Sequence, residues 1–396
     1  MKKILFITWD GPQTSYMEGL FMPIFEQISK TENIQFHVIQ FTWAEETKIR
    51  LVREKAKEMG VVYTAFPVLR KPVASLGSMI TVRTSAGKIK KYIRENQIDL
   101  VLPRSTFPAM MVNLIKNRNF KILFDADGLP IEERLDFSGL KKDSFQYRWM
   151  KSAETRMLKN ADAVITRSQK AVDIHVQTIG EAYRPKFSVV KNGRNKDHFQ
   201  KNEDLRHAAR EELGIGEEFL FVYAGSLGPQ YCLPEMQEIF TRYAEKRPSK
   251  FLILTGNPGF AEQQIPVEIS GAIILKSVAA DKVPFYLNAA DCAFGLREPS
   301  FSMQGVAPIK LGEYLLCGLP VIASKGIGDT EAILQEFEAC FLYEHGEKLN
   351  EQLEDIMEFI KKINFADKEQ IRERALEYFS LEAAAGSYKH VLDQLK

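Results

Sequence analysis

The stretch Gln304–Ser324, QGVAPIKLGEYLLCGLPVIAS, contains the signals of a loop, a short helix and a strand in succession. Proline is favoured at the first position of a helix, so we predict a helix that begins at Pro308. Gly318 is the kind of left-handed residue that commonly follows the end of a helix. The apolar run 321–323 is typical of a short buried strand. The stretch therefore predicts one helix-to-strand step of an α/β sheet.

The start of this helix has the properties of an anion-binding site. Its first backbone N–H groups have no partner within the helix, and the positive end of the helix dipole lies there, so a phosphate is favoured. The residues expected to line this site are Gly305, Val306, Ala307, Pro308 and Ile309.

Two charged residues follow on one face of the same helix, because they are three positions apart. Lys310 offers a cation to a phosphate. Glu313 offers two acceptor oxygens to a diol, such as that of a ribose. The alternative is that Lys310 and Glu313 pair with each other on an exposed helix face.

Length and composition indicate a globular protein of two domains. The chain has 396 residues, of which 45% are hydrophobic and 27% are charged. Its four cysteines form no CxxC pair, so we interpret them as small core residues in a reducing compartment. We find no signal peptide and no apolar run long enough to span a bilayer, so we expect a cytoplasmic location.

Charge is distributed unevenly along the chain. Residues 1–190 contain 30 Lys and Arg against 20 Asp and Glu, a net charge of +10, whereas the remainder has a net charge of −9. Basic and apolar residues mix between positions 70 and 94, and this stretch either contacts the inner face of an anionic membrane or is an ordinary surface helix. Its basic residues are Arg70, Lys71, Arg83, Lys88, Lys90, Lys91 and Arg94, and its apolar ones are Val73, Leu76, Met79, Ile80, Ile89 and Ile93. Nucleic acid is not expected, because aromatic residues do not interleave with these charges.

Apolar runs alternate with helical patterns along most of the chain. A turn signal at 191–195 interrupts the alternation, which then restarts. Such alternation predicts parallel sheets with helices on both faces. We therefore expect two doubly wound, Rossmann-like domains at residues 1–195 and 196–379, and a C-terminal helix at about 380–396 that packs back on the first domain.

Several segments resemble the GT-B glycosyltransferases, specifically the large retaining family 4, and they keep the order of that family. The segments are ADAVIT at 161–166 with Ser168, VKNG at 190–193 with Phe199, YAGSLG at 223–228, VPFYLNAAD at 283–291, and PIKLGEY at 308–314 with GLPV at 318–321. The resemblance implies that the domains face a central cleft, the first binding an acceptor and the second a nucleotide sugar. It also implies that Gly225 and Ser226 belong to a phosphate loop and that Glu313 holds the ribose hydroxyls.

The sequence departs from the family pattern at three positions. Gly305 stands where the family has the first of two glutamates, and Ser226 stands where an arginine is common. The segment 124–128 has no histidine where the family offers one. These departures resemble a polysaccharide-synthesis branch of the family.

The implied reaction is transfer of a hexosyl or N-acetylhexosaminyl group from a UDP- or GDP-linked sugar to a hydroxyl acceptor, with retention. The acceptor is a saccharide or a lipid-linked saccharide, as in the synthesis of bacterial capsule, lipopolysaccharide or other surface polysaccharide. Charge develops on the diphosphate as the sugar leaves, and Lys310 and the loop N–H groups are expected to stabilise it. No cofactor and no divalent metal are then needed.

Two residues of the first domain, Asp127 and Gly11, are also candidate site residues. Asp127 is expected to be a polar group on the acceptor side, with an Asx-type turn as the alternative. The spacing of Asp125 and Asp127 also suits a metal, but we prefer a role in acceptor orientation or loop structure. Gly11 is expected to let the backbone approach the diphosphate, with a plain strand-to-helix turn as the alternative.

Two other functions stay open. One is a nucleotide-sugar 2-epimerase of the same fold, although the six histidines are scattered. The other is a non-catalytic subunit that binds a sugar nucleotide, which the missing glutamate at Gly305 keeps in consideration.

Overall fold

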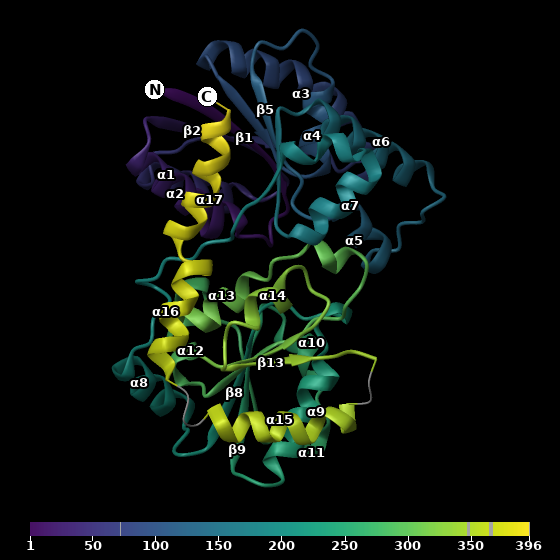
Figure 1. The fold of residues 1–396 in the computed structure, drawn as a ribbon. Coiled ribbons are helices and arrows are strands. Elements are labelled where there is room, and N and C mark those ends of the chain that lie inside the picture. The colour runs from purple at the N-terminus through teal and green to yellow at the C-terminus, as the bar shows by residue number, and fades with distance from the viewer. Residues whose placement is uncertain (72, 347–348, 364–366, 396) are drawn as a thin grey trace. The chain divides into compact units, whose positions relative to one another are not determined.

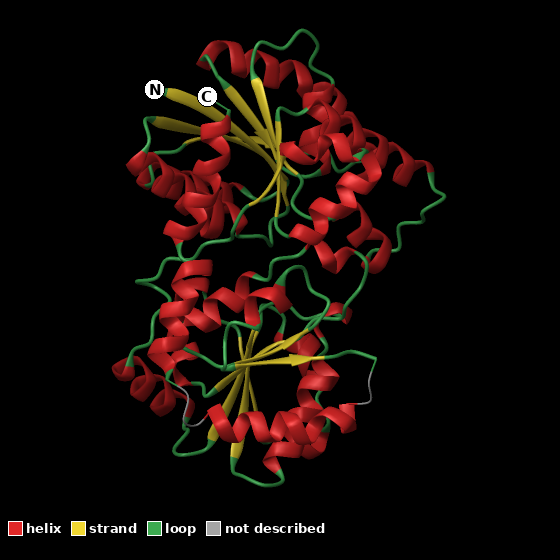
Figure 2. Cartoon of the chain, viewed as in Figure 1, coloured by secondary structure: helices red, strands yellow, loops and turns green. Residues whose placement is uncertain are grey.

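The computed structural model describes residues 1–71, 73–346, 349–363 and 367–395, and within it the chain divides into two compact units. The first unit contains Met1–Gly193, Gln304–Val306 and Leu381–Lys396. The second contains Arg194–Met303 and Ala307–Ser380. In each unit a parallel sheet lies between layers of helices, as Figures 1 and 2 show.

The sheet of the first unit has seven parallel strands in the order β3-β2-β1-β4-β5-β6-β7. The strands are β1 (Lys2–Asp10), β2 (Ile34–Thr42), β3 (Val62–Pro67), β4 (Leu100–Pro103), β5 (Lys121–Asp125), β6 (Ala163–Thr166) and β7 (Phe187–Val189). Strand order reverses between β1 and β4, and open α/β sheets bind ligands at the carboxyl ends of the strands beside such a reversal. Asp10 ends β1 at this edge, Gly11 follows it, and Arg104 follows β4.

Helices cover both faces of the first sheet. They are the π-helix η1 (Met17–Phe21), α1 (Met22–Thr31), α2 (Glu46–Glu58), α3 (Ala74–Asn96), α4 (Thr106–Asn113), α5 (Pro130–Phe137), α6 (Phe145–Asn160), α7 (Gln169–Ile179), the 3₁₀-helix η2 (Glu181–Lys186) and α17 (Leu381–Gln394). The core on one face contains Leu5, Ile39, Val101 and Phe124, all of them buried. Because helices cover both faces, the central strands β1, β4, β5 and β6 are largely buried on both sides, whereas the edge strands β3 and β7 are partly exposed.

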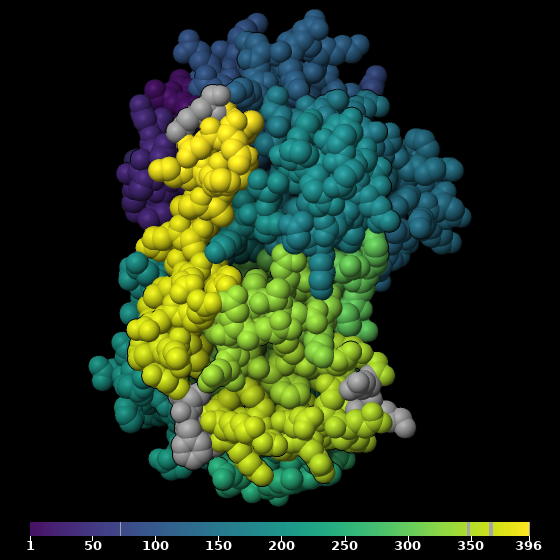
Figure 3. All heavy atoms as spheres, viewed as in Figure 1, coloured from purple at the N-terminus to yellow at the C-terminus, as the bar shows by residue number. Residues whose placement is uncertain are grey.

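The last helix, α17, belongs to the first unit and packs against α1. Figure 3 shows this yellow segment in contact with the purple and teal parts of that unit. The hydroxyl of the buried Tyr388 accepts a hydrogen bond from Arg167 at 3.2 Å, and Ser387 Oγ accepts one from the Lys191 N–H at 3.0 Å. The end of the chain is thereby tied to the segment that follows β6 and to the segment that follows β7.

The sheet of the second unit has six parallel strands in the order β10-β9-β8-β11-β12-β13. The strands are β8 (Phe219–Ala224), β9 (Ser249–Leu254), β10 (Ile273–Lys276), β11 (Cys292–Gly295), β12 (Val321–Ser324) and β13 (Cys340–Tyr343). The helices are α8 (Glu203–Leu213), η3 (Pro229–Tyr231), α9 (Leu233–Ala244), α10 (Pro258–Glu262), α11 (Val267–Ser270), η4 (Ala280–Lys282), α12 (Val283–Ala289), η5 (Ser302–Gly305), α13 (Ile309–Leu316), α14 (Thr330–Leu334), α15 (Leu349–Ile363) and α16 (Lys368–Phe379). Strand order reverses between β8 and β11, so the predicted class of two doubly wound parallel sheets is confirmed.

Helix α13 begins one residue later than the sequence predicts. Pro308 is its N-cap, in extended conformation with φ −67° and ψ 114°, rather than its first helical residue. The predicted end is confirmed, because Gly318 has φ +71° and donates its N–H to Leu315 O at 2.9 Å. Leu319 donates to Tyr314 O at 3.0 Å, which completes the two-bond closure typical of such an end.

Among the described residues, no helix combines the length and the apolar character that crossing a bilayer requires.

Candidate functional site

Lys310 lies on the first turn of α13, and its side chain reaches the carboxyl end of β8. Its Nζ donates a hydrogen bond to Tyr223 Oη at 2.7 Å. The same nitrogen lies 4.1 Å from the ring centroid of Tyr223 and 4.6 Å from that of Tyr231. A β-carbon on Gly225 would lie 2.7 Å from this nitrogen, so only glycine leaves room for it. The structure therefore brings together Lys310 and Gly225, two of the predicted site residues.

The environment of Lys310 makes its positive charge costly in the free protein. Burial lowers the pKa of its ammonium well below the ordinary value of 10.5, and the charge of Arg297 acts in the same direction, while Glu313 opposes both. An anion bound here would offset these costs and favour the charged form. The position is thus suited to a phosphate group.

Arg297 is a second cation beside the same aromatic pair, and the sequence analysis did not find it. Its guanidinium lies 4.9 Å from the ring centroid of Tyr231, and Nη2 donates to the Tyr231 hydroxyl at 3.5 Å. Arg297 lies just after β11. Strand β11 is the neighbour of β8 at the point where the strand order reverses. A basic residue just after a predicted strand indicates a ligand-binding position if that strand lies where the strand order reverses. This pattern can be used only when the strand order is known.

Glu313 shares a helix face with Lys310 but has a different partner. Its Oε1 accepts a hydrogen bond from Arg194 Nε at 2.8 Å, and its side chain is 15% exposed. Among the described residues, Lys310 and Glu313 form no ion pair with each other. The alternative that these two side chains pair on an exposed helix face is therefore not found. Arg194 therefore holds the Glu313 carboxylate in place.

Helix α13 is fixed against the end of β8 by a buried tyrosine. The hydroxyl of Tyr314 accepts the Ala224 N–H at 2.8 Å and faces Ala224 O at 3.3 Å. Gly225 follows, with φ +144°, and donates its own N–H to Leu254 O at 2.8 Å. Ser226 O accepts the hydroxyl of Tyr223. The N–H of Gly225 is therefore hydrogen-bonded within the sheet. Gly225 contributes to the site because its missing side chain leaves room for Lys310.

The turn after β5 contains Asp127, which is held by an arginine. Its carboxylate accepts a hydrogen bond from Arg104 Nη2, and Arg104 Nη1 lies 3.8 Å from Asp10 Oδ1. The Asp127 N–H donates to Asp125 Oδ1 at 3.0 Å, and Asp127 has φ +56°. The Asx-type turn is thus present, with Asp125 as the accepting side chain. Asp125 also pairs with Arg167 at 2.7 Å, so both aspartates of the Asp125-Ala126-Asp127 motif face arginines.

A buried histidine supports this turn. His175 Nε2 lies 3.0 Å from Gly128 O, and burial lowers the pKa of His175 to about 4. The ring is therefore neutral and donates through Nε2. The sequence analysis treated His175 as one of several scattered histidines, because its position on α7 gives no hint of a partner 47 residues earlier in the chain.

Gly305 and Gly128 pack in direct backbone contact. A β-carbon on Gly128 would lie 2.3 Å from Gly305 O, and one on Gly305 would lie 2.8 Å from the Leu129 nitrogen. Ser168 Oγ donates to Gln304 O at 2.7 Å while it caps α7 through the Ala171 N–H. Segment 304–306 groups with the first unit for these reasons, whereas Ala307, Pro308 and Ile309 group with the second. The glycine that replaces the glutamate of the resembled family is therefore required by packing.

Gly11 lies beneath an aromatic ring. A β-carbon on Gly11 would lie 2.9 Å from Trp43 Cζ2, and Gly11 O accepts the Thr14 N–H at 3.3 Å in a turn. These contacts account for the glycine by packing and by the plain turn. Its role toward a diphosphate stays a prediction.

The basic, amphipathic stretch of the first unit divides into two parts. Ile89 and Ile93 are buried, so the apolar side of the second half of α3 packs into the core of the first unit. At its start Val73 is 60% exposed and Leu76 is 46% exposed, and Met79 and Ile80 are also exposed. A cavity of about 410 Å³ adjoins this patch, with Leu114, Trp149 and Arg156 in its wall.

No family profile and no curated protein matches this sequence. Solved structures do match in fold, over the whole chain and at low identity. HepE of Anabaena in complex with UDP-glucose has a TM-score of 0.70 at 16% identity, covering 100% of this chain and 99% of that one. Sucrose-phosphate synthase of Thermosynechococcus elongatus has a TM-score of 0.72 at 16% identity, and the coverage of the two chains is the same as for HepE. WaaG, a glycosyltransferase of lipopolysaccharide biosynthesis, has 0.68 at 14%, covering 98% of each chain. The fold is that of the GT-B glycosyltransferases.

Proposed function

We propose that this protein is a retaining glycosyltransferase of family 4 type, which moves a hexosyl or N-acetylhexosaminyl group from a UDP- or GDP-linked sugar to a hydroxyl acceptor. The observation that carries the proposal is the position of Lys310, which packs on two tyrosines at the switch point of the second sheet. The fold supports it, since one matching structure holds UDP-glucose and another is named a sucrose-phosphate synthase.

The second unit would bind the nucleotide sugar. Lys310 and the start of α13 supply positive charge for the diphosphate, and Arg297 adds a second cation nearby. Glu313, fixed by Arg194, accepts the ribose hydroxyls. When the bond between the anomeric carbon and the phosphate oxygen breaks, its electron pair stays on the diphosphate. Preorganised cations lower the free energy of that charged state without reorganising during the reaction. No metal and no cofactor enter this donor site.

The first unit would bind the acceptor. Asp127 is held by Arg104 at the carboxyl end of the sheet, and Asp10 lies beside the same arginine. A carboxylate in this position accepts a hydrogen bond from a sugar hydroxyl and orients it. We place the reaction in the cytoplasm, in synthesis of a bacterial surface polysaccharide, capsule or lipopolysaccharide.

We also propose that the start of α3 contacts the inner face of an anionic membrane that carries a lipid-linked acceptor. Exposed Val73, Leu76 and Ile80 provide the apolar part of this contact. Arg70, Lys71 and Arg83 lie in the same stretch and complement anionic headgroups.

A second candidate is a subunit that binds a sugar nucleotide without transferring the sugar. The packing of Gly305 on Gly128 favours it, since no acidic side chain fits at this position. For the 2-epimerase, His175 offers no support, because its ring is buried and its Nε2 donates to Gly128 O.

Calorimetry against UDP, GDP, ADP and their sugars tests donor binding, and NMR of the product formed with a lipid-linked saccharide tests transfer and retention. Binding with transfer supports the enzyme, binding without transfer to any acceptor supports the subunit, and no binding to any nucleotide contradicts both.

A further inference from the structure

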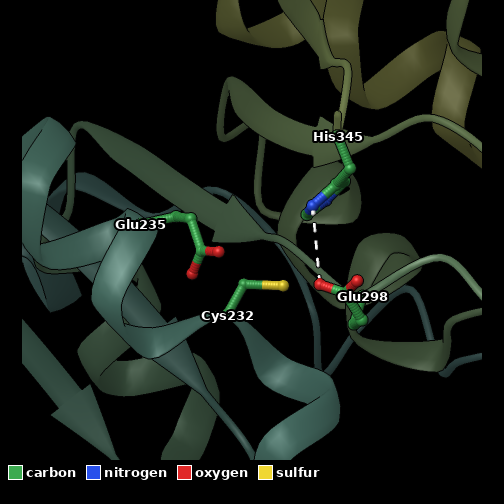
Figure 4. Close-up of side chains that lie close together, drawn as sticks. All are labelled: Cys232, Glu235, Glu298 and His345. Carbon is green, nitrogen blue, oxygen red and sulfur yellow. Dashed lines mark ion pairs between the residues drawn. The ribbon is translucent and has the colours of Figure 1, made fainter. Parts of the chain in front are cut away.

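Four side chains of metal-ligating type converge in the second unit, beside the proposed donor site and separate from the residues assigned to it. Cys232, Glu235, Glu298 and His345 each offer one ligand atom, and these four atoms all lie within 4.8 Å of one another. Figure 4 shows the thiol, the two carboxylates and the imidazole pointing toward a common point, with Cys232 and Glu235 on one segment and Glu298 and His345 on two others. This arrangement of sulfur, nitrogen and oxygen donors is not a purely acidic surface cluster.

The four residues meet because they follow neighbouring parallel strands. Cys232 caps α9 after β8, and Glu235 lies in the first turn of that helix. Glu298 follows β11 and His345 follows β13. Parallel strands end at one edge of the sheet, so residues spread over more than a hundred positions come together there. Ligands so far apart in the sequence form no short spacing pattern, and no metal site is therefore predicted from the sequence.

The backbone of Cys232 is in an unusual conformation for its residue type. It has φ +48°, the left-handed region that residues other than glycine and asparagine seldom adopt. Its side chain is buried, and it aims its sulfur at the other three groups. Uncommon backbone conformations of this kind cost free energy and gather at functional sites.

The ring of His345 is oriented by a partner outside the cluster. Its Nε2 lies 2.8 Å from Ser324 Oγ, and its Nδ1 lies 3.7 Å from Glu298 Oε2. Ser324 Oγ also accepts the Arg297 N–H at 2.8 Å, so it is well placed to accept the Nε2 proton with its other lone pair. In the tautomer with the proton on Nε2, Nδ1 presents its lone pair to the cluster. Metal-binding histidines are commonly oriented by such a hydrogen bond at the opposite nitrogen.

We propose that Cys232, Glu235, Glu298 and His345 bind one Zn²⁺ ion. Thiolate and imidazole together favour zinc over magnesium or calcium, and four protein ligands suit a closed structural site.

Ligand atoms in a tetrahedral zinc site lie roughly 3.3 to 3.8 Å apart. The cluster must therefore contract by about 1 Å, which the half-exposed side chain of Glu298 allows by rotation. Three anionic ligands exceed the charge of the ion by one, and Arg297, next to Glu298 in the chain, places a cation beside this excess.

The ion would tie together the segments that follow β8, β11 and β13. Tyr231 directly precedes Cys232, and its ring lies 4.6 Å from Lys310 Nζ. The zinc therefore fixes the loop that carries one of the two tyrosines beneath the proposed phosphate-binding lysine. Its role is structural, and zinc binding does not depend on which substrate the protein takes.

The test uses the full-length protein stripped with a chelator and then titrated with Zn²⁺ in competition with a chromophoric chelator, and separately with Co²⁺. We expect one ion per chain and a near-ultraviolet band from thiolate-to-cobalt charge transfer. Cys232→Ser should remove the band and weaken zinc binding by about 100-fold, and Glu298→Gln, a change at a half-exposed side chain, should weaken it by about tenfold. Circular dichroism checks that both variants fold.

Two matched variants control for general effects of the substitutions. Cys340→Ser alters another free cysteine of the same unit, and Glu238→Gln alters an exposed glutamate of α9, so both should keep the band and the zinc affinity. A cobalt spectrum without the thiolate band overturns the proposal. Zinc affinity that is unchanged in both Cys232→Ser and Glu298→Gln, or no ion retained against the chelator, overturns it equally.

Discussion

Gly225 leaves the space that the Lys310 side chain fills: a β-carbon on the glycine would lie 2.7 Å from Lys310 Nζ. The two residues come from the end of β8 and the start of α13, 85 positions apart, and the buried Tyr314 holds the two elements together. The absence of a side chain at Gly225 is thus part of how the cation is positioned.

Gly225→Ala should displace the Lys310 side chain and weaken nucleotide binding. The φ of +144° also disfavours alanine, so we expect a stability loss of about 1–3 kcal/mol. Gly256→Ala is the matched control, because a β-carbon there meets nothing within 4 Å. Calorimetry and urea unfolding measure the two effects. If Gly225→Ala binds nucleotide as the wild type does, the lysine does not need this space.

Glu313→Ala should weaken binding of a nucleoside diphosphate by about 10-fold, because the ribose loses a charged acceptor. Pyrophosphate has no ribose, so its affinity should change little. Glu217→Ala, at an exposed glutamate of the same unit, serves as the control. Equal losses for pyrophosphate and nucleotide would show that Glu313 acts on the phosphates or on the fold instead of on the ribose.

His175 should make stability depend on pH between about 4 and 6.5. Burial lowers its folded-state pKa to about 4, whereas the unfolded chain titrates near 6.5, so the unfolded state binds the proton first as pH falls. The stability contribution is complete above 6.5 and is lost as pH falls toward 4, to a total of about 3 kcal/mol. His175→Gln should remove this part of the slope in urea unfolding at several pH values. Identical pH profiles for the two proteins would contradict the assignment.

The start of α3 should bind vesicles that contain anionic lipid. We expect the double variant Leu76→Ser with Ile80→Ser to lower the partition coefficient by about tenfold or more, because two exposed apolar side chains lose their membrane contact. Val267→Ser is the control, since Val267 is 84% exposed but lies in the second unit. Sedimentation with vesicles measures both. Equal binding to neutral and anionic vesicles, or no effect of the double variant, argues against this surface.

The sequence predicted the fold class because its strands are short apolar runs separated by helical patterns, and both sheets follow that alternation. The end of α13 was also predictable, since Gly318 satisfies a local backbone requirement. Contacts between distant residues were not predictable. Arg104 beside Asp127, Gly128 beside Gly305 and Arg194 beside Glu313 depend on strand order and loop course, which residue spacing does not encode. The same holds for the four proposed zinc ligands.

Lys310 should also make nucleotide affinity depend on pH. Burial lowers the pKa of its ammonium, so the free protein loses this charge at a lower pH than an exposed lysine would. A phosphate binds the protonated form, so affinity should fall as pH rises through that pKa. Lys310→Met should show weaker binding without this fall.

Calorimetric titration of UDP and GDP into the wild type, Lys310→Met and the exposed-lysine control Lys282→Met tests the central claim most directly. We predict that the wild type and Lys282→Met bind one of the two nucleotides equally well, and that Lys310→Met binds it about 10- to 100-fold more weakly. Unchanged affinity in Lys310→Met, or no binding of either nucleotide by the wild type, would contradict the account.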